Sequence, residues 1–296
     1  MTDHGLTEEQ LAAYERDGFL FPLPLLSGDQ AGDLRSGIEG AQSRARDVAN
    51  MFQYTFNVPH LVIPQVQELV TRPDVLDRVE AVMGPDIMLW AASLFIKEAN
   101  TTDFVSWHQD LRYWGLDDDA HELTVWVAVT DVTPENGAMR FVPGSHRSGL
   151  VEHSDTFSAD NQLSRGQEIA QTVDEADAVT VALKAGDVSM HHGSLFHASG
   201  PNTTADRRIG LAVRYICPEM RQGVGSVDHA TLVRGVDRYG HFEPMAEPTF
   251  DFDPFRMAAI DRMLLAENEF FYKGAEDKAP AHGRRKEMAE PANPAG

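Results

Sequence analysis

The fold is decided by short runs of β-branched and aromatic residues, of which ELTVWVAVTDV at residues 122–132 is typical. Similar runs fill the chain from residue 86 to 216, and they read IMLWAASLFIKEA (87–99), GAMRFVPGS (137–145), AVTVALKAGDVSMHH (178–192) and RRIGLAVRYI (207–216). Turn residues such as Pro143-Gly144-Ser145 and Gly186-Asp187 separate the runs. Many short strands divided by turns predict a mainly β protein, either a sandwich or a jelly-roll barrel.

Helices are expected on both sides of this β region. Thr7 with Gln10, and Ser27 with Gln30, carry the capping-box signature of helix starts. The segment VQELVTRPDVLDRVEAVMG (66–84) predicts a helix that is interrupted at its proline and ends at its last glycine.

Beyond the β region, apolar residues at helical spacing predict a last helix over about 254–272. We therefore expect one domain over residues 1–272, with a helical part to about 85 and a barrel over about 86–216. The polar segment 151–175 is expected to be partly helical and to cap the barrel. The Ala- and Pro-rich segment 273–296 predicts a disordered tail.

Composition narrows the class of function. The 296 residues include 25 basic and 46 acidic side chains, a net charge of −21, which disfavours nucleic-acid and membrane-surface partners. A hydrophobic fraction of 42% excludes global disorder. Cys217 is the single cysteine, which excludes an internal disulfide framework. We read no signal peptide and no apolar run of about 18 residues, so we expect a cytoplasmic protein whose oligomeric state the sequence does not indicate.

Residues 106–110, Ser-Trp-His-Gln-Asp, contain a possible pair of metal ligands. In an extended strand, residues two apart share a face, so His108 and Asp110 could reach one centre. An imidazole and a carboxylate are two of the three ligands in the two-histidine, one-carboxylate set that holds non-haem Fe(II). The same triplet also fits an exposed polar pair at the end of a strand.

A second window, His191-His192-Gly193-Ser194-Leu195-Phe196-His197-Ala198-Ser199-Gly200-Pro201-Asn202, supplies a possible third ligand. It precedes Arg207 and Arg208, which would face opposite sides of a strand. A dicarboxylate co-substrate such as 2-oxoglutarate needs an anchor for its far carboxylate, and the planar guanidinium group of arginine matches a carboxylate with two hydrogen bonds.

Together these residues resemble the phytanoyl-CoA dioxygenase family of Fe(II)/2-oxoglutarate-dependent oxygenases. The resemblance is carried by three motifs: His108-Gln109-Asp110-Leu111, then Asn136-Gly137 with Val142-Pro143-Gly144-Ser145-His146, and His197-x-Ser199-Gly200-x-Asn202 followed by Arg208. It spans about Asp86 to Tyr215, and it implies a double-stranded β-helix, the cupin-like jelly-roll barrel of that family.

The resemblance also implies a role for each matched residue. The iron ligands would be His108, Asp110 and His197, with His191 and His192 as less favoured candidates for the third position. The residues matched to co-substrate contacts are Arg208, Ser199, Trp126, Gln109 and, less closely aligned, Ser93. Substrate contact is expected from the residues that follow the first motif, which are Arg112, Tyr113 and Trp114.

The implied activity is hydroxylation of an unactivated carbon of a small organic molecule with Fe(II), 2-oxoglutarate and O₂. In related halogenases the carboxylate ligand is absent, so Asp110 favours hydroxylation over halogenation. Desaturation, cyclisation and epimerisation use the same cofactors and remain open. A zinc-dependent hydrolase or isomerase and a non-catalytic ligand-binding barrel are alternatives of other classes.

Overall fold

The computed structural model describes residues 5–48, 50–117 and 121–271, so the tail expected at 273–296 lies outside the described residues. Its α-helices are α1 (Glu8–Asp17), α2 (Gly28–Ala45), α3 (Met51–Asn57), α4 (Pro59–Val62), α5 (Pro64–Val70), α6 (Pro73–Met83), α7 (Leu111–Trp114) and α8 (Pro254–Phe271). Three short 3-10 helices are η1 (Pro134–Asn136), η2 (Ser145–Ser148) and η3 (Glu175–Asp177).

The strands form two larger antiparallel sheets and one hairpin. They are β1 (Phe19–Pro24), β2 (Ile87–Lys97), β3 (Val105–His108), β4 (Glu122–Ala128), β5 (Met139–Phe141), β6 (His153–Asp155), β7 (Gln167–Ile169), β8 (Val179–Val181), β9 (Asp187–His191), β10 (His197–Ser199), β11 (Arg208–Ile216) and β12 (Thr231–Arg234). The large sheet has the order β1-β9-β4-β11-β2-β12, and the small sheet has the order β3-β10-β5-β8. Strands β6 and β7 pair with each other.

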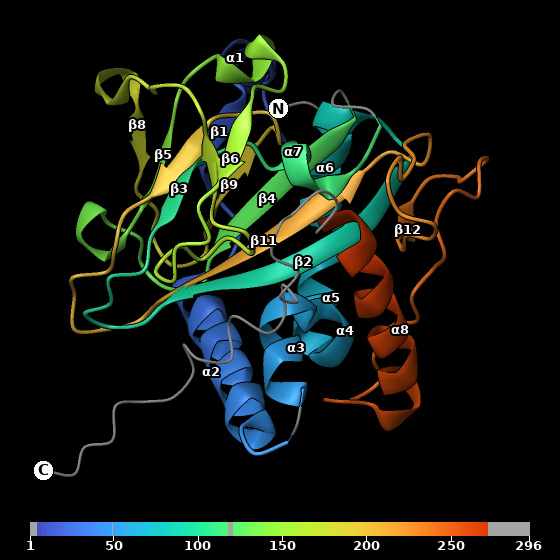
Figure 1. The fold of residues 1–296 in the computed structure, drawn as a ribbon. Helices are drawn as coiled ribbons and strands as arrows, with labels where there is room; N and C mark the ends of the chain where they lie inside the picture. The colour runs from blue at the N-terminus through green and yellow to red at the C-terminus, as the bar shows by residue number, and fades with distance from the viewer. Residues whose placement is uncertain (1–4, 49, 118–120, 272–296) are drawn as a thin grey trace, which may run out of the picture.

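The central strands β4 and β11 of the large sheet are buried on both faces. Along β11, Leu211 and Val213 belong to an apolar core that includes side chains of α2 to α6, whereas Ala212 packs with Trp126 and Phe141 between the two sheets. Figure 1 shows α2, α3, α4 and α5 on one side of strand β2, with the small sheet on the other side. Alternate residues of β11 therefore point into the space between the sheets, where a functional site can be built.

The local helix signals are confirmed. Thr7 and Ser27 cap α1 and α2 with the expected capping boxes, and α1 ends at Gly18 in the left-handed conformation, φ +83°. Pro73 is the first residue of α6, which ends at Gly84, so the expected interruption of the helix is present.

The expectation of partly helical structure at 151–175 is wrong. This segment forms the β6–β7 hairpin, and its chain reversal is stabilised by the Thr156 hydroxyl, which donates to the carbonyl of Gly166 at 2.6 Å. Gly166 has φ +61°, a conformation that glycine adopts without a steric penalty. The division of the chain into one domain with the bounds given above stays a prediction.

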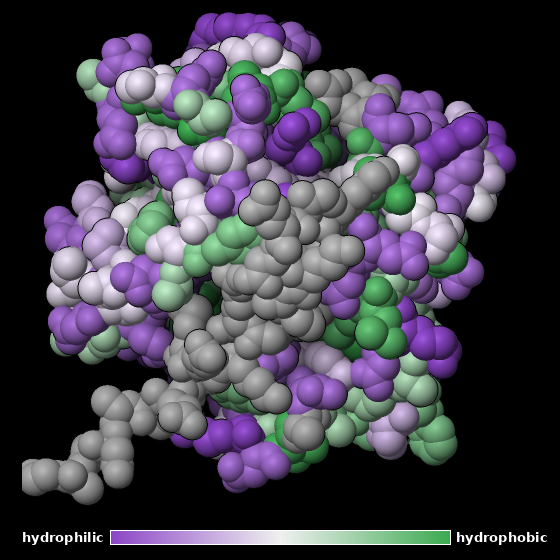
Figure 2. All heavy atoms as spheres, in the orientation of Figure 1, coloured by the Kyte–Doolittle hydropathy of each residue, from purple (hydrophilic) through white to green (hydrophobic). Residues whose placement is uncertain are grey.

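Much of the surface visible in Figure 2 is hydrophilic, and the hydrophobic residues between the hydrophilic ones form small patches. Within the described ranges, no helix has the length and apolar character needed to cross a bilayer.

Candidate metal centre

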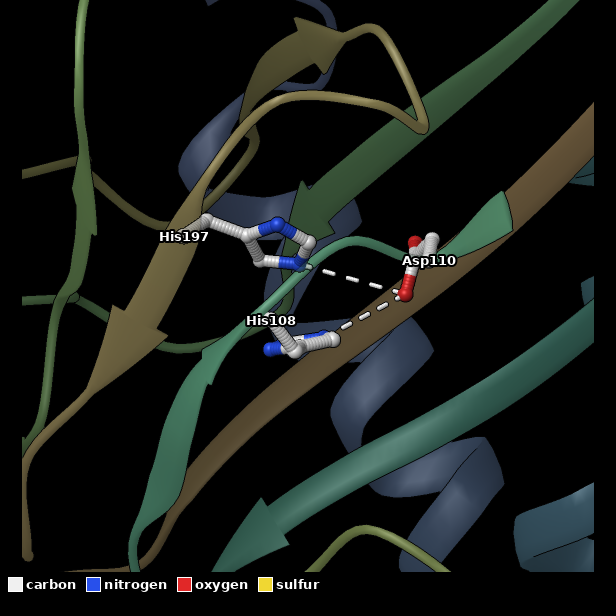
Figure 3. A group of neighbouring side chains, drawn as sticks. All are labelled: His108, Asp110 and His197. Atoms are coloured by element: carbon white, nitrogen blue, oxygen red, sulfur yellow. Dashed lines mark ion pairs between the residues drawn. The ribbon is translucent and has the colours of Figure 1, made fainter. Parts of the chain in front are cut away.

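Three side chains predicted from the sequence meet at one point between the sheets. His108, Asp110 and His197 each offer a ligand atom, and these atoms all lie within 4.8 Å of one another. The Oδ1 atom of Asp110 lies 3.3 Å from Nε2 of His108 and 3.9 Å from Nε2 of His197 (Figure 3). The two histidines are buried, His108 with 4% and His197 with 6% of its surface exposed, and Asp110 is partly buried.

The small sheet sets the spacing of the two histidines. His108 ends β3, His197 begins β10, and their Cα atoms are direct partners in the antiparallel pair. Directly opposed residues carry their side chains on the same face, so both imidazoles point to one centre. The ring centroids lie 4.0 Å apart.

Asp110 reaches the centre by a different path from the one the sequence suggested. We expected His108 and Asp110 on one extended strand, but the strand ends at His108 and Asp110 has helical backbone angles, φ −59° and ψ −51°, immediately before α7. The chain turns because the side chain of Gln109 is bonded to distant backbone groups. It donates to the carbonyls of Gly149 and Ser194 and accepts from the N–H of Val151.

The hydrogen bonds of the two histidines orient them as metal ligands. Nδ1 of His108 lies 2.8 Å from the carbonyl oxygen of Ser106, and Nδ1 of His197 lies 3.0 Å from that of Leu195. A carbonyl oxygen can only accept, so each Nδ1 must carry the hydrogen, and each neutral ring presents an Nε2 lone pair to the centre. This arrangement fits a metal ion held by two histidines and a carboxylate, the ligand set of non-haem iron sites.

The electrostatics favour the same protonation states. Burial would raise the pKa of Asp110, but the two histidines and Arg214 outweigh burial, and the pKa lies well below its usual value. Burial, followed by the charge of His108, keeps the pKa of His197 well below its usual value. A neutral imidazole and an ionised carboxylate are the forms that bind metal.

The other histidines of the second window lie outside the cluster. The ring of His191 lies near that of His197, with centroids 5.0 Å apart and the ring planes tilted by 55°, but His191 belongs to β9 of the opposite sheet. Nδ1 of His192 contacts Glu122 at 3.3 Å and accepts from the N–H of Ser194.

A small cavity extends from the cluster to Arg208, and Trp126 and Ser199 line it as well. Arg208 is 1% exposed, and the carbon of its guanidinium group lies 5.3 Å from the Trp126 ring centroid. Burial lowers the pKa of Arg208 to about 10, so it keeps its charge at neutral pH. Arg207 points to the other side of β11, where it pairs with Glu98.

Two of the residues that the family resemblance matched to co-substrate contacts lie outside the small cavity. Gln109 is fully buried, lines neither cavity described here, and uses its amide for the three backbone bonds given above. Ser93 accepts a hydrogen bond from Nη1 of Arg214 at 2.9 Å and lines a second, larger cavity.

The larger cavity has a volume of about 490 Å³ and opens onto His108 and Asp110. Of the expected substrate contacts, Tyr113 and Trp114 line it, whereas Arg112 lies exposed on the surface. Its volume is within the range of small-molecule sites.

Sequence reasoning missed three charged residues that line these cavities or lie beside a residue that does. Arg214 lines both cavities, Glu267 of α8 lines the larger one, and Lys97 lies beside Arg208. Arg214 lies on the same face of β11 as Arg208, because the two positions differ by an even number. The strand pattern could therefore have indicated Arg214. The burial of Lys97 and Glu267 and the pairing of Lys97 with Arg208 leave no signal in a single sequence.

Comparison with known proteins gives the family. Residues 14–210 match the family model "Phytanoyl-CoA dioxygenase (PhyH)". The chain belongs to the phytanoyl-CoA dioxygenase family. It is thus an enzyme of the Fe(II)/2-oxoglutarate-dependent dioxygenase class, with iron as cofactor and 2-oxoglutarate and O₂ as co-substrates.

Relatives and a solved structure agree with this placement. A probable alpha-ketoglutarate-dependent hypophosphite dioxygenase of Stutzerimonas stutzeri is 25% identical over 189 residues, which cover 63% of this chain and 62% of the relative. An L-proline trans-4-hydroxylase of Streptomyces griseoviridis is 26% identical over 68% of this chain and 83% of the relative. The non-heme monooxygenase ThoJ superposes with a TM-score of 0.81 and 35% identity, covering 89% of this chain and 98% of ThoJ. The expected double-stranded β-helix is thereby confirmed.

Proposed function

We propose that this enzyme hydroxylates a carbon of a small organic substrate, and that His108, Asp110 and His197 hold its iron. The observation that carries the proposal is the cluster of these three side chains at one end of a cavity whose other end holds a buried arginine. Bound Fe(II) supplies O₂ activation, which couples oxidative decarboxylation of 2-oxoglutarate to succinate and CO₂ with oxidation of the substrate.

Arg208 is the proposed anchor of the 2-oxoglutarate carboxylate that lies away from the metal. Its Nη1 donates to the carbonyl of Gly137 at 3.3 Å, and its Nε has no hydrogen-bond partner among the described residues. A buried guanidinium group gains a strong partner when a carboxylate enters, because charge-assisted bonds of this kind are the strongest hydrogen bonds in proteins. Trp126 and Ser199 complete the walls of this end of the cavity.

Arg214 is not proposed as the anchor of this carboxylate. Arg208 and Arg214 are six positions apart on β11, a distance of about 20 Å along a strand. Arg214 lines the larger cavity as well, between the rings of Phe95 and Trp114 at 5.8 and 5.7 Å. We assign the 490 Å³ cavity to the primary substrate and place Tyr113 and Trp114 among its contacts.

A small substrate suits both this volume and the names of two relatives, which specify hypophosphite and L-proline as their substrates. Hydroxylation is preferred because Asp110 supplies the carboxylate ligand that halogenases of this type lack. A cytoplasmic location remains a proposal.

The test uses the purified enzyme, Fe(II), 2-oxoglutarate and a panel of amines, amino acids, phosphonates, fatty acids and acyl-CoA esters. We expect succinate formation that one of these classes stimulates, inhibition by Zn²⁺, and loss of succinate formation in His197→Ala. His241→Gln is the matched control, because this histidine bonds to the carbonyl of Met220 away from the cluster. Turnover with Zn²⁺ alone and without 2-oxoglutarate would instead identify a zinc hydrolase or isomerase.

Labelled oxygen separates the possible reactions. In hydroxylation, one atom of ¹⁸O₂ enters succinate and the other enters the product alcohol. Desaturation, cyclisation or epimerisation leaves no label in the product. An unlabelled product would therefore overturn hydroxylation while leaving the cofactor assignment intact.

A further inference from the structure

Three side chains in register across the large sheet carry buried polar atoms that no described residue satisfies. Arg214 of β11 pairs directly with Thr124 of β4, and Thr124 pairs directly with His191 of β9. Nε of Arg214, the Thr124 hydroxyl and both ring nitrogens of His191 have no hydrogen-bond partner among the described residues. Arg214, Thr124 and His191 are called the polar row below.

The polar row is deeply buried. Thr124 and His191 are each 1% exposed, and Arg214 is 8% exposed. A buried polar group that lacks a hydrogen-bond partner destabilises the folded state, and folded proteins contain few such groups. Three of them at directly paired positions therefore indicate that a bound molecule completes their hydrogen bonds.

The polar row faces the candidate metal centre. All of its residues line the small cavity, together with the three side chains of the metal-ligand cluster. The ring centroid of His191 lies 5.0 Å from that of His197. Trp126, two positions from Thr124, shares its face of β4 and lies against Arg208 toward the other end of the cavity. The row therefore lies at the end of the cavity that is opposite to the proposed anchor.

The chemistry of the polar row favours an anion. A guanidinium group can only donate hydrogen bonds, a hydroxyl can donate one, and an imidazole donates from one ring nitrogen in either neutral tautomer. Arg214 also brings a positive charge. A carboxylate accepts several such bonds, and when a metal binds one of its oxygens the other can still accept. 2-Oxoglutarate carries such a carboxylate beside its keto group, in addition to the one assigned to Arg208.

We propose that Thr124 and His191 are further co-substrate-binding residues, each of which donates a hydrogen bond to the carboxylate that adjoins the keto group of 2-oxoglutarate. The small cavity then holds the co-substrate at both ends, with Arg208 at the far carboxylate. His191 thereby has a role of its own beside the three metal ligands. This inference rests on the proposed function, which places 2-oxoglutarate in this cavity.

The experiment measures 2-oxoglutarate binding by titration calorimetry, with the enzyme saturated with Mn²⁺ under anaerobic conditions so that no turnover occurs. Thr124→Val keeps the shape of the side chain and removes its hydroxyl, so the dissociation constant should rise about tenfold or more. Thr124→Ser loses a methyl group but keeps the hydroxyl, and it should bind like the wild type. A packing role would give the opposite order, with Val tolerated and Ser damaging.

The same measurement tests His191. His191→Phe keeps a ring in place and removes both nitrogens, and we expect weakening of about tenfold or more, which His191→Gln should partly restore because its amide can donate. Ser189→Ala is the matched control, because Ser189 is another buried hydroxyl of β9 without a described partner but lines neither cavity. Affinity for Mn²⁺ should be unchanged in every variant. A loss of Mn²⁺ affinity as large as the loss of 2-oxoglutarate affinity would instead assign His191 to support of the metal ligands.

Oxalate identifies the end of the co-substrate that the two residues contact. It resembles the keto-acid end of 2-oxoglutarate and lacks the far carboxylate, so Thr124→Val and His191→Phe should weaken its binding by about the same factor, whereas Arg208→Ala should leave it unchanged. Normal binding of either ligand by Thr124→Val or His191→Phe would overturn the proposed contact of that residue. If the wild type failed to bind 2-oxoglutarate at all, the proposed function would fall as well.

Discussion

Trp126 lies across Gly210 of the neighbouring strand so closely that a Cβ atom at position 210 would overlap its indole ring. The same ring lies against the guanidinium group of Arg208. Gly210 has no side chain to hold the indole away, and it thereby lets Trp126 form the wall of the cavity that leads to the metal ligands.

The substitution Gly210→Ala should therefore weaken 2-oxoglutarate binding. The new methyl group must displace the buried Trp126 ring, and overpacking of this kind costs about 1–3 kcal/mol. We expect a rise of about tenfold or more in the dissociation constant of 2-oxoglutarate, measured by calorimetry with Mn²⁺-loaded enzyme. Gly32→Ala is the matched control, because no atom lies within 4 Å of a Cβ there, and it should bind normally. Equal binding by both variants would show that the ring is free to move.

The local signals of the sequence predicted the starts of two helices, but they gave no helix over α3 and α4 and no strand over β1. A capping box needs only residues three apart, so Thr7 with Gln10 and Ser27 with Gln30 were sufficient to place the starts of α1 and α2. The segment 151–175 had no comparable signal, and its hairpin depends on the conformation of Gly166.

The candidate ligands could be predicted, but the way they meet could not. Asp110 turns toward His108 because Gln109 bonds to backbone groups that lie 40, 42 and 85 residues away in the sequence. The pairing of Lys97 with Arg208 depends on the register of β2 against β11, which the two runs do not specify by themselves. The structure therefore adds two kinds of information that the motif does not contain: the register between strands that are distant in the sequence, and the burial of each side chain.

Removal of the proposed anchor should be selective for the co-substrate. Arg208→Ala would leave the carboxylate of 2-oxoglutarate buried without its partner, at a cost of about 3–5 kcal/mol, or about two to three and a half orders of magnitude in affinity. Metal binding should persist, since Arg208 contacts none of the three ligand side chains by a described hydrogen bond. Calorimetry with Mn²⁺ and then with 2-oxoglutarate measures both steps.

Arg207→Ala provides the comparison, because Arg207 pairs with Glu98 on the other side of the strand. It should bind 2-oxoglutarate like the wild type. Unchanged affinity in Arg208→Ala, or a larger loss in Arg207→Ala, would assign the anchor to another cation.

Gln109 is expected to act on stability more than on co-substrate binding. Gln109→Leu removes two donors and one acceptor from buried backbone groups and should lower the free energy of unfolding by about 2–4 kcal/mol. Urea denaturation measures this loss. Gln109→Glu keeps the acceptor for Val151 but places an oxygen opposite two carbonyls, so it should be at least as unstable. If folded Gln109→Leu lost 2-oxoglutarate affinity without losing stability, a direct contact would be the better interpretation.

Glu267 of α8 should make the enzyme less stable as the pH rises. Burial, with a smaller contribution from Asp228, raises the pKa of Glu267 to about 8 in the folded state, whereas the unfolded value is about 4.3. Between these values the folded chain retains a proton that the unfolded chain has lost, so the free energy of unfolding falls with pH by up to about 1.4 kcal/mol per unit. Glu267→Gln removes this dependence, and its stability advantage over the wild type should grow from pH 5 to pH 8 in urea denaturation.

Glu269→Gln is the control two residues along the helix. The carboxylate of Glu269 accepts hydrogen bonds from Ser226 and has a lowered pKa, so it is ionised in the folded and the unfolded chain over this range. The change of stability with pH should therefore be the same in Glu269→Gln as in the wild type. Parallel stability curves for the wild type and Glu267→Gln would mean that Glu267 is already ionised in the folded enzyme.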